Sequence, residues 1–539
     1  MPRPGRRCLN PESMRKLLIL AAALLSAACA EAPQPEINVI PRPLSVEQGD
    51  GAFRLGRSCP IGYDDPALQS VAALCAGYLT EEGERKPVVA DKPVHKGIDL
   101  QLDGTLAGEE YTLSATKKGV SICGGSPRAV LYGVQTLRQL IDGDRVPVVE
   151  IRDEPYFGYR GAMFDVARYF YPVEEVKRFI DIMALHKLNT FHWHLTDDQG
   201  WRIEIKRYPE LTRIGSQRRE TLIGHYKTSD EYDGKPYGGY YTQDEIREVV
   251  AYAAERCIDI IPEIELPGHS MAALASYPWL GCTKGPYEVR TTWYYSSDVL
   301  CAGRETTFEF LENVLTEVIG LFPSKYIHVG GDECPKVRWK ACPDCQRRMR
   351  REGLADEDAL QSYFVCRIEE WLHAHGREMI GWDELLEGGV TPSTIVMSWR
   401  GTEGGIEAAK LGNRVIMAPR FYFYLDYYQT SDPERNGEPL SIGRNVPIRK
   451  LYGYDPFDRL DEAQSRNILG VQANLWTEYI ATMDHAEYML LPRLAAMSEV
   501  AWATERRDYD DFVRRLGSLR GLYDREGYRY ADFVFRGIE

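Results

Sequence analysis

Hydrophobic and polar positions change their rhythm near residue 155. Between about residues 37 and 150, short stretches alternate apolar and polar side chains, as in "GIDLQLD" at 97–103, which is typical of strands with one buried face. Residues 126–141, "SPRAVLYGVQTLRQLI", have instead the 3.6-residue period of an amphipathic helix. The pattern predicts an N-terminal α+β domain over residues 37–152.

From residue 155 to 505, apolar strand candidates alternate with helical segments. Candidate helices include residues 173–187, 242–257 and 305–322. The candidate strands are residues 159–167, 189–197, 258–266, 326–331, 378–384, 393–399, 414–419 and 468–476. Eight such units predict an α/β fold, a (β/α)8 TIM barrel, over residues 155–505. Residues 506–539 predict a C-terminal helical extension packed on the barrel.

The first 30 residues predict an export signal. "MRKLLILAAALLSAACA" at 14–30 has two basic residues, an apolar run too short for a membrane span, and then small residues. "LSAAC" resembles a bacterial lipoprotein cleavage site, which predicts lipidation of Cys29; simple secretion is the alternative. The expected location is the cell envelope, in the periplasm or at the outer membrane, or outside the cell.

Composition narrows the possible partners. The formal net charge is -15 and there is no long basic block, so nucleic acid is excluded as the main partner. Membrane contact is expected only through the lipid anchor. The 33 Tyr and 10 Trp offer flat faces for core packing or for stacking on sugars.

Cysteine spacing leaves several chemistries open. Cys282 and Cys301 flank an aromatic segment and predict a loop disulfide in an oxidising compartment. "CPDC" at 342–345, with Cys334 upstream, suggests zinc or redox chemistry. Because the sequence has no second CxxC and no nearby His pair, a loop disulfide or buried thiols are favoured, and no metal site is predicted.

Chemistry-bearing residues gather at the predicted C-terminal ends of the strands, where TIM barrels hold their active sites. These residues are Asp165, Arg168, Asp197, Asp198, His269, Asp332, Glu333, Trp382, Asp383, Glu384, Trp399, Trp476 and Glu478. Carboxylates can supply a proton and support an oxocarbenium-like transition state, and aromatic faces stack on sugar rings. The rim therefore predicts a glycosidase.

Asp332 and Glu333 are adjacent in "HVGGDE". Retaining and inverting glycosidases ordinarily need two carboxyl groups that face each other across the scissile bond. Consecutive residues reach a sugar from the same side, so one of the two needs another role.

Six motifs, in order along the chain, carry a resemblance to a known family. They are "YRGAMFDVARYF" (159–170), "HKLNTFHWHLTDDQGWRIEI" (186–205), "PEIELPGH" (262–269), "HVGGDE" (328–333), "GWDE" (381–384) and "LWTE" (475–478). Over most of residues 37–505 the chain resembles family 20 glycoside hydrolases, which are β-N-acetylhexosaminidases. Glu265 departs from the family pattern, which often has Asp at that position.

The resemblance implies an exo-acting, retaining enzyme that removes terminal β-linked GlcNAc or GalNAc from glycans without a cofactor or metal. In this family the substrate's own acetamide carbonyl is the nucleophile and forms an oxazolinium intermediate. Glu333 would be the general acid and base, and Asp332 would orient the acetamide.

The resemblance also assigns the remaining site residues. Tyr424 would donate to the acetamide carbonyl inside a cage of Trp382, Trp399 and Trp476. Asp197 and His269 would tune Glu333. Sugar hydroxyls would be held by Arg160 (3- and 4-positions) and by Asp426 and Glu478 (4- and 6-positions).

Several alternatives remain open at this point. Arg160 precedes the middle of its strand, so it could form an ion pair at the bottom of the barrel. His192 and His194 could bind a metal or pack in the core, and Asp198 could support the site or face solvent. Competing functions are a catalytically inactive sugar-binding lipoprotein and a metal-dependent hydrolase, whose ligand set would have only His269 free at a strand end.

Overall fold

The computed structural model describes residues 36–81 and 85–538 of the chain. The predicted export signal and Cys29 lie outside the described residues. Within them, no helix is both long and apolar enough to cross a membrane.

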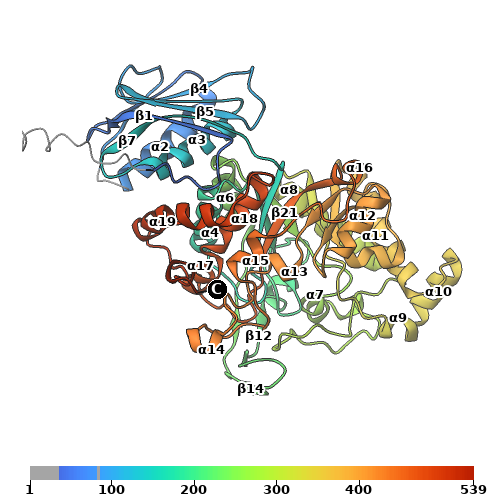
Figure 1. Cartoon of the computed structure of the whole chain (residues 1–539). Coiled ribbons are helices and arrows are strands. Elements are labelled where there is room, and N and C mark those ends of the chain that lie inside the picture. Colours follow the sequence, from blue (N-terminus) through green and yellow to red (C-terminus); the bar gives the residue numbers. More distant parts are fainter. Residues whose placement is uncertain (1–35, 82–84, 539) are drawn as a thin grey trace, which may run out of the picture.

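The N-terminal domain is a seven-stranded mixed sheet covered by two helices. Its strands, in spatial order, are β1 (Ser45–Arg54), β7 (Arg145–Asp153), β5 (Tyr111–Thr116), β6 (Gly119–Gly124), β4 (Ile98–Leu102), β2 (Pro60–Tyr63) and β3 (Val88–Ala90). The helices α2 (Gln69–Glu81) and α3 (Pro127–Leu140) lie between this sheet and the rest of the molecule (Figure 1). Ser126 caps α3 by accepting a hydrogen bond from the backbone N–H of Ala129, and Pro127 fits the first turn.

The second domain is a closed barrel of eight parallel strands, as the alternation of apolar segments predicted. Its strands are β8 (Tyr159–Asp165), β9 (Thr190–His194), β16 (Asp259–Glu263), β17 (Tyr326–His328), β18 (Glu378–Trp382), β19 (Ile395–Ser398), β20 (Val415–Met417) and β21 (Ile468–Leu475). Each overlaps one predicted strand. The strands are buried almost throughout, because helices cover the outside and side chains fill the inside.

The helices around the barrel are less regular than the strands. The main ones are α4 (Val173–Leu185), α6 (Gln243–Glu255), α8 (Glu305–Leu321), α11 (Glu357–Ala374), α12 (Glu403–Leu411), α17 (Met483–Leu490) and α18 (Arg493–Trp502). Between β18 and β19 the chain forms only a 3-10 helix, Asp383–Gly388. The connection at this unit is too short for a longer helix, and the predicted (β/α)8 barrel is confirmed.

The two domains meet at the N-terminal end of the barrel. Arg160, near the start of β8, is fully buried and donates to Glu109 Oε2 at 2.9 Å and to the carbonyl of Phe157 at 2.6 Å. Lys187, before β9, forms a buried ion pair with Asp153 at 3.2 Å. Because Glu109 and Asp153 belong to the N-terminal domain, these pairs anchor it to the bottom of the barrel.

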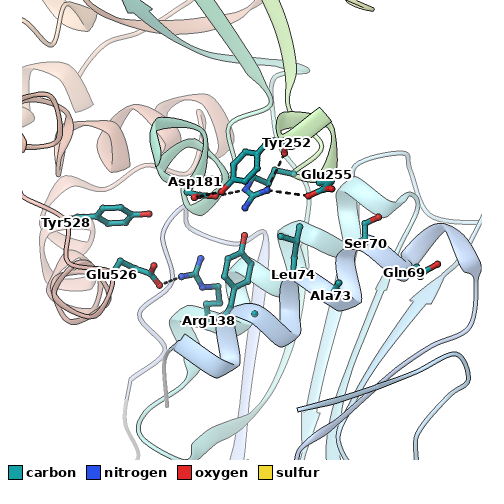
Figure 2. Close-up of a pocket in the computed structure, with 13 residues that line it drawn as sticks. Gln69, Ser70, Ala73, Leu74, Arg138, Asp181, Tyr252, Glu255, Glu526 and Tyr528 are labelled. Carbon is teal, nitrogen blue, oxygen red and sulfur yellow. Dashed lines mark hydrogen bonds and ion pairs between the residues drawn. The ribbon is translucent and has the colours of Figure 1, made fainter. Parts of the chain in front are cut away.

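A cavity of about 500 Å³ lies at this same junction. Figure 2 shows Arg138, from α3, turned toward Glu526, which follows α19 (Tyr509–Arg525). On the barrel side Asp181 pairs with Arg256, and Tyr252 donates to Asp181 at 2.7 Å. The C-terminal helix thus contributes to the domain junction, and the charged groups around the cavity are paired with one another.

Candidate active site

The adjacent acids Asp332 and Glu333 lie in a sharp turn after β17. Gly330 and Gly331 have φ values of 66° and 100°, and Glu333 itself has a φ of 41°. A Cβ on Gly330 would come within 1.8 Å of the Glu265 carboxylate, so only glycine fits there. The turn buries Asp332 and leaves the Glu333 side chain 36% exposed.

His269 connects both acids to a third carboxylate. Its Nε2 lies 3.4 Å from Glu333 Oε2 and 3.6 Å from Asp332 Oδ2, and its Nδ1 lies 2.9 Å from Asp197 Oδ1. Burial disfavours the charged imidazole, but Asp197 and Asp332 raise the pKa of His269 well above its usual range. The structure therefore brings Asp197, His269, Asp332 and Glu333 into one chain of contacts.

Asp197 is held as a carboxylate at the far end of that chain. It lies 2.9 Å from Arg168 Nη2 and 2.9 Å from His194 Nε2. Burial opposes ionisation, but Arg168 and His269 lower the pKa of Asp197 well below its usual range. Its neighbour Asp198 is buried and accepts hydrogen bonds from the backbone N–H groups of Met271 and Ser296, so it supports the loop and does not face solvent.

Asp332 is set apart by its environment. Burial raises its pKa to about 6, while His269 acts in the opposite direction. Its Oδ1 is buried without a hydrogen-bond partner among the described residues. Burying a carboxylate oxygen without a hydrogen bond costs free energy. The position therefore favours a ligand that donates a hydrogen bond to Asp332 Oδ1.

Four aromatic side chains form a continuous wall beside the acids. The ring centroids of Trp382 and Trp476 are 6.1 Å apart, those of Trp476 and Tyr424 are 6.2 Å apart, and those of Tyr424 and Trp399 are 6.1 Å apart. Leu425 N–H donates to the carbonyl of Asn474 at 2.8 Å, so the segment that carries Tyr424 is attached to β21. The predicted cage residues come together.

Asp426, in the segment after β20, and Glu478, just after β21, continue the site. Both are buried, and Asp426 Oδ1 has no hydrogen-bond partner among the described residues. Burial raises the pKa of Glu478 to about 7, with Arg168 opposing, and burial followed by the Glu478 charge raises the pKa of Asp426 well above its usual range. Arg493 fixes this loop by donating to the carbonyls of Leu425, Tyr427 and Val446.

Of the predicted site residues that the structure describes, Arg160 is the one that lies elsewhere. It lies at the N-terminal end of β8, while the carboxylates lie at the C-terminal ends of their strands, so it cannot grip a sugar in this site. The structure corrects that assignment in favour of the open alternative, an ion pair at the barrel bottom. The cation at the correct end is Arg168, which pairs with Asp165 at 3.2 Å and lies over the Trp476 ring.

The histidines of "FHWHL" are buried and both contact Glu263. His192 Nε2 lies 3.0 Å from Glu263 Oε2, His328 Nδ1 lies 2.7 Å from Glu263 Oε1, and His194 also contacts Glu263. Trp382 Nε1 donates to Glu263 Oε1 at 2.9 Å. Glu263 therefore positions a cage tryptophan from below. Its role was not foreseen, because it depends on contacts among several strands.

Glu384 supports the cage in the same way. It accepts a hydrogen bond from Trp399 Nε1 at 2.8 Å. Burial and the nearby Asp332 raise the pKa of Glu384 well above its usual range. The "GWDE" motif indicated this residue, because it places Glu384 two positions after Trp382, at the end of the strand.

A TIM barrel whose C-terminal face combines paired acids with an aromatic wall defines a carbohydrate-active hydrolase. Residues 157–505 match the model of the glycosyl hydrolase family 20 catalytic domain, and residues 36–154 match that of glycosyl hydrolase family 20, domain 2. The chain belongs to glycosyl hydrolase family 20.

Individual relatives agree with this assignment. A β-hexosaminidase of Porphyromonas gingivalis is 44% identical, with 95% of this chain and 67% of the relative aligned. One from Vibrio furnissii is 39% identical, over 86% of this chain and 76% of the relative. The crystal structure of an exo β-N-acetylglucosaminidase from Vibrio harveyi in complex with N-acetylglucosamine superposes with a TM-score of 0.82, at 34% identity, covering 93% of this chain and 80% of that one.

Proposed function

We propose that this protein is an exo-acting, retaining β-N-acetylhexosaminidase that removes terminal β-linked GlcNAc or GalNAc from glycans by substrate-assisted catalysis. The observation that carries the mechanism is the shared contact of Asp332 and Glu333 with one nitrogen of His269, at 3.6 and 3.4 Å. Two carboxyl groups held against the same atom reach a sugar from one side. They are badly placed to act on opposite faces of the scissile bond, which favours a nucleophile supplied by the substrate.

Exposure separates the roles of the two acids. Glu333 is the more exposed and can protonate the leaving oxygen, then activate water in the second step. Asp332 is buried with a free Oδ1 that can accept the acetamide N–H and balance the positive charge of the oxazolinium ring. Tyr424 and the three tryptophans would hold the acetamide in place, so that its carbonyl oxygen lies near the anomeric carbon.

The remaining polar groups support binding of the sugar hydroxyls. Arg168 is the cation that lies among the site acids, and we assign to it the hydroxyl contact first expected of Arg160. Asp426 Oδ1 has no hydrogen-bond partner among the described residues and can accept from a hydroxyl group. A terminal sugar enclosed in this way favours exo cleavage.

The first experiment compares hydrolysis of chromogenic β-GlcNAc and β-glucoside by the purified protein. Rapid cleavage of the first with almost none of the second is the expected result, because only the first carries the acetamide nucleophile. Equal cleavage would contradict substrate assistance. Cleavage of neither, with binding of N-acetylglucosamine-containing ligands retained, would favour the inactive sugar-binding protein.

We also propose that the protein is exported and anchored through a lipid on Cys29. The support is the basic, apolar and small-residue order of residues 14–30. Metabolic labelling with a radioactive fatty acid should mark the wild-type chain and not Cys29→Ser. Equal labelling of both chains, or of neither, would contradict the anchor.

A further inference from the structure

Four cysteine side chains converge from the two segments that follow β16 and β17. Cys282 and Cys301 belong to the loop between β16 and α8, and Cys342 and Cys345 to the segment after β17. Their sulfur atoms all lie within 4.8 Å of one another. The sequence pattern missed this set, because its two halves are far apart in the chain: Cys301 and Cys342 are 41 positions apart. The disulfide predicted between Cys282 and Cys301 is also absent, since all four are thiols.

The distances suit a tetrahedral metal centre. Sγ–Sγ separations are 3.8 Å for Cys282–Cys345, 3.8 Å for Cys301–Cys342 and 3.7 Å for Cys301–Cys345. In a tetrahedral ZnS4 centre with Zn–S bonds of about 2.3 Å, neighbouring sulfurs lie about 3.8 Å apart. Cys301, Cys342 and Cys345 are buried and Cys282 is partly exposed, which gives an ion a route of entry.

The backbone around the thiols is arranged to bring the loops this close. A Cβ on Gly303 would come within 2.3 Å of the backbone nitrogen of Cys345, so the two loops touch main chain to main chain. Trp339 Nε1 donates to the carbonyl of Leu300 at 2.9 Å and joins the same two segments.

Arg304 is placed to offset part of the negative charge of such a centre. Zn²⁺ with four thiolates carries a net charge of about -2. Arg304 donates to the carbonyls of Gly281 at 3.0 Å and Cys282 at 3.3 Å, and it pairs with Asp344 at 2.7 Å. Its guanidinium therefore contacts residues next to cysteines of both segments and would offset part of that charge.

From these observations we propose that Cys282, Cys301, Cys342 and Cys345 bind a structural Zn²⁺ ion. Four protein ligands close the coordination sphere, so the ion takes no part in hydrolysis. It fastens together the loop that carries His269 and the segment that carries Asp332 and Glu333. Binding converts the thiols to thiolates and releases their protons to solvent.

The decisive measurement is made on the full wild-type chain, purified without chelators. Elemental analysis should find one zinc per chain, and zinc X-ray absorption should show sulfur ligands only, at about 2.3 Å. Removing the zinc with a chelator should lower the melting temperature, and adding zinc back should restore it.

Variants locate the site. Cys345→Ser should lose the zinc, whereas Cys366→Ser, which changes a thiol on α11 outside the cluster, should keep it. Because Cys345→Ser could fail to fold, the ligand set from the wild-type absorption spectrum stands as the independent test.

Three results would overturn the proposal. One is a metal-free chain whose mass is lower by four hydrogens, which means two disulfides. Another is four free thiols that take up no zinc under reducing conditions. The third is zinc bound through oxygen or nitrogen ligands.

Discussion

The two ends of the barrel both hold buried charged side chains, but only the C-terminal end leaves carboxyl oxygens of the site acids without a partner among the described residues. At the N-terminal end, Arg160 and Lys187 are fully buried and meet Glu109 and Asp153 of the first domain. At the C-terminal end, Asp332 and Asp426 each keep a buried oxygen without a partner among the described residues. The paired charges at the N-terminal end hold one domain on the other. The carboxyl oxygens without a partner at the C-terminal end are available to a ligand. The N-terminal end of the barrel therefore contributes to stability and the C-terminal end to function.

The largest effect is expected from removing the acid at the C-terminal end. Glu333→Gln should lower kcat by about 10²–10⁴-fold, because the leaving oxygen loses its proton donor. Stability should hardly change, since the side chain is partly exposed. The loss should shrink with a dinitrophenyl leaving group, which needs no protonation. An equal loss for poor and good leaving groups would contradict the general-acid role.

Replacing the arginine at each end, in two separate variants, tests the comparison directly. Arg160→Met should lower the free energy of unfolding by about 3 kcal/mol, because it leaves Glu109 and several carbonyls without their donor. Its KM should stay near the wild-type value. Arg168→Met should lower kcat/KM by about 100-fold through lost sugar contacts. Denaturant unfolding and steady-state kinetics on both variants would decide, and a kinetic defect confined to Arg160→Met would reverse the assignment.

Burial of the ionised Asp332 carboxylate should lower the free energy of unfolding at neutral pH. Burial raises the pKa of Asp332 to about 6, above the value near 3.9 expected of an unfolded chain. The fold therefore favours the protonated acid, and the stability it contributes at low pH is lost as pH rises through about 6. Asp332→Asn should then raise the free energy of unfolding at pH 7.5 by about 2 kcal/mol and change it little at pH 4. Stabilisation that does not depend on pH would contradict this origin.

The pH profile should show the smallest effect. Since the ionised form of Asp332 balances the oxazolinium charge, kcat/KM should fall about tenfold per pH unit below about 6. The residual activity of Asp332→Asn should lack this acidic limb. An unchanged limb in the variant would assign it to another group.

Local patterns predicted most of the fold and the acidic part of the site. Apolar runs bounded by turns located all eight barrel strands, because a parallel strand buried on both faces has to be apolar along its length. The rule that parallel strands present their C-terminal ends to one face then brought Asp197, His269, Asp332 and Glu333 together. The tertiary structure places them in contact.

Sequence order could not decide which partner each charged group meets, or which distant loops assemble. Arg160 and Arg168 are eight residues apart, and at about 3.3 Å per residue a strand carries them to opposite ends of the barrel. Only the docked first domain, with Glu109 beside Arg160, shows which of them is structural. The four thiols and the contacts of Glu263 arise likewise from segments far apart in the chain. Periodicity reports how each segment is buried, whereas partners across the fold are set by packing in three dimensions.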